Sequence, residues 1–167
     1  MKKLMLTLFV ALFALHISAQ KFCHVDTEYI LSKIPAYQQA QNSLDKLAKD
    51  WQTEVEGKFS EVEDMYNKYQ AEKVLLPDDT QRQREEEIIN KEKEAKELQK
   101  KYFGREGELY QKRQELVKPI QDNVYNTLKS LAVEGGYDYI FDKVTGDIIY
   151  ANEKYDESDE VLKKIIE

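Results

Sequence analysis

The chain has 167 residues, of which 25 are lysine or arginine and 32 are aspartate or glutamate, giving a formal net charge of −7. This acidic balance argues against nucleic-acid binding, which depends on basic side chains that neutralise phosphates. The single cysteine, Cys23, excludes an intramolecular disulfide. We expect its thiol to be buried; the alternative is a disulfide between two chains.

The first 19 residues are typical of a secretory signal peptide. Lys2 and Lys3 precede an apolar run at residues 4–17, and Ser18-Ala19 supplies small residues for cleavage. The run is too short for a membrane-spanning helix, which needs roughly 20 residues. We therefore expect export and cleavage after Ala19. Removing the two lysines from the 25 basic residues leaves 23 against 32 acidic residues, a net charge of −9.

A short strand is predicted over residues 21–26 (KFCHVD), at the start of the mature chain. Asp26 or Thr27 is suited to cap a helix that follows, because both side chains accept hydrogen bonds from backbone N–H groups. Pro35 is expected to end that helix after one or two turns.

A long helix is predicted from Ala36 onward. Its apolar residues recur with a mean spacing of 3.6, the period of a helix with one apolar stripe. Such a helix would extend for roughly 60 Å, farther than a compact domain of this size is wide. The stripe consists of Leu44, Leu47, Trp51, Val55, Phe59, Val62, Tyr66 and Tyr69.

A turn is predicted at LLPDDT, residues 75–80, because Pro77 disfavours continued helix before it. Asp78, Asp79 or Thr80 is expected to cap a second helix that extends to Glu134. Two long helices joined by a tight turn predict an antiparallel coiled-coil hairpin. The second apolar stripe consists of Ile88, Ala95, Leu98, Tyr102, Leu109, Leu116, Ile120, Val124, Leu128 and Leu131.

Two glycines interrupt the second helical pattern, at Gly104 and Gly107. If the turn is centred beside Pro77, residues whose numbers add to about 155 face each other across an antiparallel pair, so Gly104 faces Trp51. Our hypothesis is that Gly104 makes room for the indole; the alternative is a flexible point. Pro119 predicts a kink farther along.

A strand hairpin is predicted after Gly135-Gly136, which ends the helix. Its strands are YDYIFD (residues 137–142) and DIIYA (147–151), and a short helix follows over residues 156–165. Both faces of the hairpin are apolar, and the chain's own helices, including residues 120–131, suffice to cover only one. Self-association is the expected way to cover the other face.

The predicted organisation is therefore a signal peptide at 1–19, a helical hairpin arm at 36–118 with its tip near 76–80, and a β-containing oligomerisation body. The body comprises residues 20–35 and 119–167. Candidate residues of the oligomer interface are Phe22, Val25, Tyr137, Tyr139, Ile140, Phe141, Ile148, Ile149 and Tyr150.

Three segments resemble the Skp/OmpH family of periplasmic chaperones. They are KFCHVDTEYILSKIPAYQQAQNSL, KPIQDNVYNTLKSLAVEGGYDYIFD and the closing IIYA…DESDEVLKKI. The resemblance implies an α+β, mostly α, jellyfish-like fold: strands of three subunits form a small β body, from which three coiled-coil hairpins project around a cavity. It also implies an ATP-independent periplasmic holdase that keeps unfolded outer-membrane proteins in that cavity. Members of the family are often basic, so the acidic charge here argues against contact with membrane lipid or lipopolysaccharide.

Apolar side chains on the arm are the candidates for contact with unfolded clients. Tyr66, Tyr69 and Tyr102 lie on the stripes and are expected to pack between the helices instead. Leu75 and Leu76 are open to both interpretations, since they could merely cap the hairpin. The client-contact candidates are Val74, Leu75, Leu76, Ile88, Ile89, Phe103 and Tyr110.

An enzyme is not expected, because the sequence contains no glycine-rich phosphate loop and no activated nucleophile. No cofactor or metal site is expected either. His24 is the one histidine left after signal removal, and Asp138, Asp142 and Asp147 lie around a predicted turn, where aspartate is common. The competing hypothesis is an exported structural or adaptor coiled coil that bridges envelope components.

Overall fold

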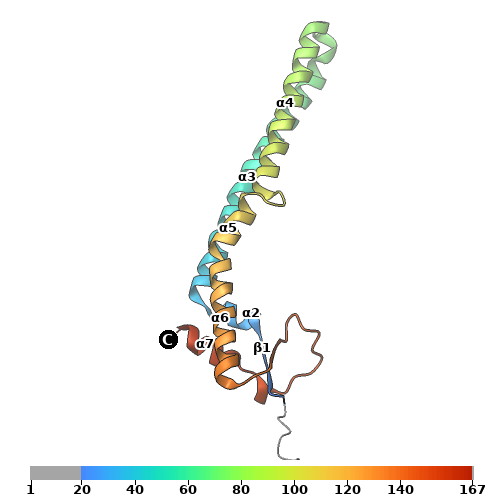
Figure 1. The fold of residues 1–167 in the computed structure, drawn as a ribbon. Coiled ribbons are helices and arrows are strands. Elements are labelled where there is room, and N and C mark those ends of the chain that lie inside the picture. The colour runs from blue at the N-terminus through green and yellow to red at the C-terminus, as the bar shows by residue number, and fades with distance from the viewer. Residues whose placement is uncertain (1–19, 167) are drawn as a thin grey trace, which may run out of the picture. The chain divides into compact units, whose positions relative to one another are not determined.

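The computed structural model describes residues 20–166, so the predicted signal peptide lies outside the described residues. It confirms a mostly helical α+β fold with long helices and a small sheet (Figure 1). Its elements are β1 (Phe22–Val25), α2 (Thr27–Lys33), α3 (Pro35–Glu72), α4 (Asp78–Phe103), α5 (Glu108–Leu116), α6 (Lys118–Gly135), β2 (Tyr139–Asp142) and α7 (Ser158–Ile166). None of the helices in the described part is both long and apolar enough to cross a bilayer.

Contacts between residues divide the chain into two compact units. The first, the strand unit, contains the described residues up to Ile30 together with those from Val124 onward. The second, the hairpin unit, contains Leu31–Asn123.

One residue determines where each of the first two helices, α2 and α3, begins. The backbone N–H of Tyr29 donates to Asp26 Oδ1 at 2.7 Å, so Asp26 caps α2 as predicted. α2 ends at Lys33, and α3 begins with Pro35 in its first turn, where the missing N–H of proline removes no helical hydrogen bond.

The hairpin unit is an antiparallel pair in which α4 and α5 lie along α3 (Figure 1). The Tyr69 hydroxyl donates to Glu85 Oε1 at 2.5 Å, and the Tyr102 hydroxyl donates to Glu54 Oε2 at 2.9 Å. The residue numbers of both pairs add to about 155, which confirms the predicted register. Tyr69 and Tyr102 are also buried, as expected of the stripes, together with Leu44, Val55 and Ala95.

The turn of the hairpin differs from the prediction in its capping. α3 ends at Glu72 and a 3-10 turn covers Lys73–Leu75, but Pro77 is the N-cap of α4 and no side chain caps it. The capping role predicted for Asp78, Asp79 or Thr80 is therefore wrong. Asp78 and Asp79 lie inside the first turn instead, where carboxylates interact favourably with the helix dipole.

The prediction of one continuous second helix is wrong, because the chain leaves the helix at Gly104 and re-enters it at Glu108. A Cβ at Gly104 would lie 2.3 Å from the backbone oxygen of Lys100, so glycine is required by its own preceding turn. Trp51 stacks on Tyr102 instead, with ring centroids 4.7 Å apart. The hypothesis that Gly104 makes room for the indole is therefore wrong.

A second interruption separates α5 from α6 at Val117. The interruption lies two residues before Pro119, where a kink was predicted, and Pro119 itself is the second residue of α6, a position that tolerates proline. Ile120 packs with Ala40, Leu44 and Val117 inside the hairpin unit, so the expectation that it covers the sheet is wrong.

The predicted strand hairpin is also wrong. β2 pairs in parallel with β1, in register from Phe22 opposite Tyr139 to Val25 opposite Asp142, and residues 147–151 form no strand. The Asp142 carboxylate ends β2 locally by accepting hydrogen bonds from the Val144 N–H and the Thr145 hydroxyl. The N–H of Glu157 then donates to the carbonyl of His24, so a later segment meets the free side of β1.

Burial in the strand unit is concentrated on β1 and the faces of its helices. Ile30 and Val161 are completely inaccessible to solvent, and Cys23 and Val25 are almost so. Val124, Leu131 and Leu162 are the other buried apolar residues of this unit.

Candidate functional site

An exposed aromatic face lies on the two-stranded sheet. Side chains alternate along a strand, so Tyr139 and Phe141 point to the same side of β2, and the register places Phe22 opposite Tyr139. The rings of Tyr139 and Phe141 lie 6.1 Å apart and nearly parallel. All three side chains are about half exposed. We call Phe22, Tyr139 and Phe141 the aromatic face.

The segment that follows β2 adds further exposed apolar side chains. Ile149 is fully exposed at 103%, and Tyr150 is 81% exposed. Ile148 is half buried and borders a hollow of about 400 Å³, which also touches Phe141 and Cys23. This segment therefore presents apolar surface that no residue in the described part of the chain covers.

The opposite side of the sheet is partly covered by α6. Val25 is buried and Ile140 is half buried, and a hollow of about 340 Å³ beside them is bordered by Tyr125 and Leu128. Tyr137, at the end of α6, is also half buried, and its hydroxyl donates to Glu157 Oε1 at 2.5 Å. This hydrogen bond, with a smaller effect of burial, raises the pKa of Tyr137 to about 12.

Polar contacts hold the segments around this sheet in place. Burial opposes ionisation of Asp142, but hydrogen bonds from Thr27, Val144 and Thr145 outweigh it and lower the pKa of this carboxyl. His24 Nε2 lies 3.1 Å from the Asn152 carbonyl oxygen, which fits its predicted role as an ordinary strand residue. These groups have structural partners.

The three turn aspartates do not form a metal site. Asp138 accepts a hydrogen bond from the Lys21 N–H. Asp142 accepts hydrogen bonds from the Thr27 hydroxyl and from Val144 and Thr145 in the turn that follows it. Within the described residues, no cluster of three histidine, cysteine or acidic side chains is arranged to hold a metal ion.

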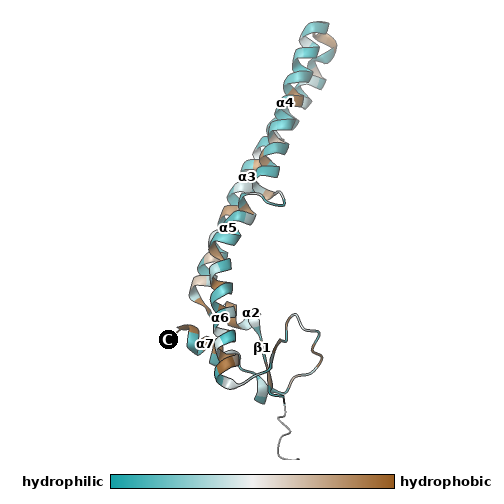
Figure 2. Cartoon of the chain, viewed as in Figure 1, coloured by the Kyte–Doolittle hydropathy of each residue, from teal (hydrophilic) through white to brown (hydrophobic). Residues whose placement is uncertain are grey.

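Apolar side chains are also exposed at the turn of the hairpin unit. Val74 is 94% exposed and Leu75 is 84% exposed, and Figure 2 shows this turn as a hydrophobic stretch on a largely hydrophilic hairpin. Ile89 and Tyr110 are exposed as well. The remaining client-contact candidates, Leu76, Ile88 and Phe103, are half buried.

Two aromatic residues of the hairpin lie differently from their predicted positions. Tyr66 is 51% exposed, so the expectation that it packs between the helices is wrong. Phe103 stands edge-on to Tyr102, with ring centroids 6.4 Å apart, so part of its surface is already used inside the hairpin.

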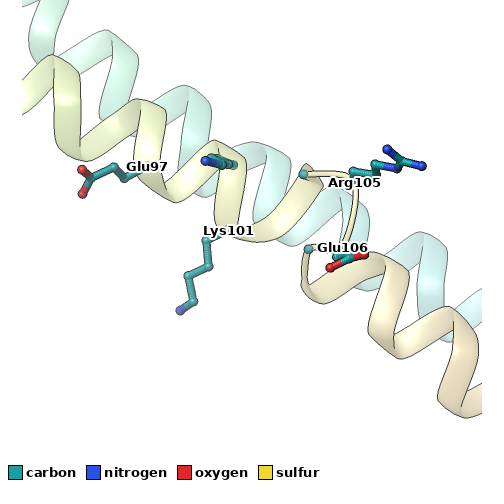
Figure 3. A pocket seen from close by; sticks show the side chains of 7 residues that line it. Glu97, Lys101, Arg105 and Glu106 are labelled. Carbon is teal, nitrogen blue, oxygen red and sulfur yellow. The ribbon is translucent and has the colours of Figure 1, made fainter.

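The loop between α4 and α5 borders an open hollow of about 540 Å³. Figure 3 shows Glu97 and Lys101 on α4 and Arg105 and Glu106 on the loop. Lys101 is paired with Glu108 at 3.3 Å. The lining is mixed in charge, which gives it no preference for an ion of one sign.

Some exposed apolar residues were missed by the sequence analysis. Val133 and Tyr125 on α6 are 80% and 64% exposed. Both lie off the apolar stripe of their helix. An apolar residue at such a position is expected to face solvent, so the sequence pattern alone indicated their exposure.

A family model described as outer membrane protein (OmpH-like) matches residues 21–165. No curated protein matches the chain. Among solved structures, the fold is similar to that of a Caulobacter crescentus protein described as an outer membrane chaperone (OmpH-like). The TM-score is 0.67 at 12% identity, and the match covers 89% of this chain and 85% of the other.

Proposed function

The chain belongs to the OmpH-like outer membrane protein family, and from this premise we propose that it is an ATP-independent holdase chaperone of the periplasm. Its clients would be unfolded outer-membrane β-barrel proteins. The observation that carries the proposal is the exposure of Val74 and Leu75 at the turn of a charged helical hairpin. Exposed apolar residues on a soluble surface mark interaction sites, and several weak contacts add up when arms act together.

The aromatic face and the exposed Ile149 support a second part of the proposal, a homotrimer assembled through the strand unit. A two-stranded sheet is marginal alone, and its exposed apolar side chains gain stability when a neighbouring subunit covers them. In this proposal the hairpin unit of each subunit forms one wall of the client cavity.

The test is suppression of aggregation. The mature protein, at one trimer per client, should keep a urea-diluted β-barrel protein soluble without nucleotide, as measured by light scattering. The double variant Val74→Ser/Leu75→Ser should lose at least half of that effect. The double variant Asn67→Ser/Gln70→Ser, which changes exposed polar residues of α3, should retain it.

Failure of the wild-type protein with several clients would contradict the proposal. If it instead captured one folded envelope protein in a stable complex, the adaptor function would be the better account.

A further inference from the structure

The turn half of the hairpin, residues 60–95, carries four exposed large apolar side chains. They are Tyr66, Val74, Leu75 and Ile89, which are 51%, 94%, 84% and 61% exposed. The register of the hairpin puts Tyr66 level with Ile89. At 1.5 Å per residue, the patch extends about 15 Å along the helices, the length of roughly five residues of extended chain. We call these four residues the turn patch.

The charges around the turn patch are strongly unbalanced. Residues 60–95 contain 11 acidic and 6 basic side chains, a net charge of −5. The rest of the hairpin unit, residues 31–59 and 96–123, contains 9 acidic and 11 basic side chains, a net charge of +2. The acidic excess of the hairpin unit is therefore concentrated in the half that carries the turn patch.

Five of the six basic residues in this half are paired with carboxylates, and Lys68 is the exception among the described residues. Lys73 lies 3.4 Å from Glu85, Lys91 lies 3.0 Å from Glu94, and Arg82 is paired with Asp79. Weaker pairs involve Arg84 with Glu87 and Lys93 with Glu97. These cations thus contribute little attraction to an approaching anion.

Five carboxylates in the same half have no ion-pair or hydrogen-bond partner among the described residues. They are Glu63, Asp64, Glu72, Asp78 and Glu86. Glu72 and Asp78 flank the turn on the two helices, next to Val74 and Leu75 in sequence. Exposed apolar side chains and unpaired carboxylates therefore occur together in the turn half of the hairpin.

We propose that the turn patch binds unfolded polypeptide segments in which apolar side chains are flanked by lysine or arginine. This inference rests on the proposed holdase function and names the class of client segment. Apolar burial supplies the attraction, and complementary charge selects among clients and accelerates their encounter. The same charge disfavours anionic lipid and a second copy of the patch itself.

The test uses two labelled peptides that share one apolar core of five residues. One peptide has two lysines on each side and the other has two glutamates. Binding to the intact mature protein is measured by fluorescence anisotropy. At 10 mM ionic strength the lysine peptide should bind roughly tenfold more tightly, and at 150 mM the ratio should shrink because exposed charges are screened.

Two charge variants with the same change in net charge locate the effect. Glu72→Gln/Asp78→Asn/Glu86→Gln should reduce the peptide ratio to about threefold or less at low salt. The control, Asp45→Asn/Asp50→Asn/Glu106→Gln, changes exposed carboxylates in the other half and should preserve the ratio. Val74→Ser/Leu75→Ser should weaken the binding of both peptides.

Equal binding of the two peptides, or a ratio that does not depend on salt, would overturn the inference and leave the holdase function standing if client aggregation is still suppressed. Loss of both peptide binding and aggregation suppression in the wild-type protein would overturn both. Binding to phosphatidylglycerol vesicles that requires Val74 and Leu75, without peptide selectivity, would assign the turn patch to a membrane. A change of native mass in the Val74/Leu75 variant would assign it to self-association.

Discussion

The thiol of Cys23 is one side chain whose chemistry follows from its position. The residue is 1% exposed on the middle of β1. Burial is the main effect that raises the pKa of the thiol to about 11, and the nearby carboxylates of Glu157 and Asp156 add to it. The reactive thiolate is therefore scarce at neutral pH, which favours the buried free cysteine over the disulfide between chains.

Cys23 should react slowly with thiol reagents while the protein is folded. A pKa of about 11 in place of the ordinary 9.0 lowers the thiolate fraction at pH 8 by roughly a hundredfold, before any loss of access is considered. The measurement is the rate of iodoacetamide labelling at pH 8, by mass spectrometry, compared with the rate in 6 M guanidinium chloride. Disulfide-linked dimers of the folded protein on a non-reducing gel would contradict this prediction.

The tyrosines of the hairpin show that helical spacing alone does not determine the burial of a side chain. Tyr69 and Tyr102 are buried as their spacing predicted, because each position on a stripe is fixed by the helical period. Tyr66 is on the same stripe but is half exposed. Tyr69 and Tyr102 each donate a hydrogen bond to a glutamate of the facing helix, and sequence spacing within one helix does not record which partner the other helix offers.

Among the elements, the break between α4 and α5 begins at Gly104. Gly104 has no room for a Cβ because the Lys100 oxygen would lie 2.3 Å away. Gly57, in the middle of α3, has nothing within 4 Å of the same position. Gly104 and Gly57 therefore make a matched pair for substitution, because one has no room for a methyl group and the other has.

Gly57→Ala should stabilise the protein by about 0.5–1 kcal/mol, since alanine is the better helix former. Gly104→Ala should destabilise it by about 1–3 kcal/mol, because the added methyl group forces the backbone to shift. Urea unfolding followed by circular dichroism, at one protein concentration, measures both changes. Stabilisation by both substitutions would show that a continuous helix is compatible with the fold.

The sheet marks the limit of what could be predicted for the elements. The helical character of the hairpin, the turn at Pro77 and a strand that ends at Asp142 were predicted because their signals are local. The pairing of that strand with β1 was not predicted. Residues 147–151 alternate as a strand would, but β2 pairs with β1, 117 residues earlier, and a pairing over that distance leaves no local pattern.

For the whole molecule, the central question is how many chains assemble. The apolar side chains proposed from sequence for the interface differ in burial. Tyr139 and Ile149 are exposed, Ile140 and Ile148 are half buried, and Val25 is buried in the subunit's own core. A strand with apolar residues on both faces is expected to have both faces covered. The sequence does not show which face the same chain covers, because that depends on the placement of α6.

Ile149→Asp should abolish the proposed trimer. Ile149 is fully exposed in the single chain, so the subunit should still fold, whereas an interface would have to bury an unpaired charge. Native mass spectrometry of the mature protein should show a trimer for the wild type and a monomer for the variant. Gln121→Asp, an exposed change in the hairpin unit, should leave the trimer intact. A monomeric wild type would refute the proposal.

The parallel pairing of β1 with β2 also makes the sheet depend on the two ends of the chain. The paired residues of the sheet, from Phe22 opposite Tyr139 onward, are 117 residues apart, whereas the hairpin turn joins neighbours in sequence. Closing the longer loop costs more entropy and requires most of the chain to have been made. β1 therefore cannot pair until residues 139–142 are present, and all residues of the helical hairpin precede them in the chain.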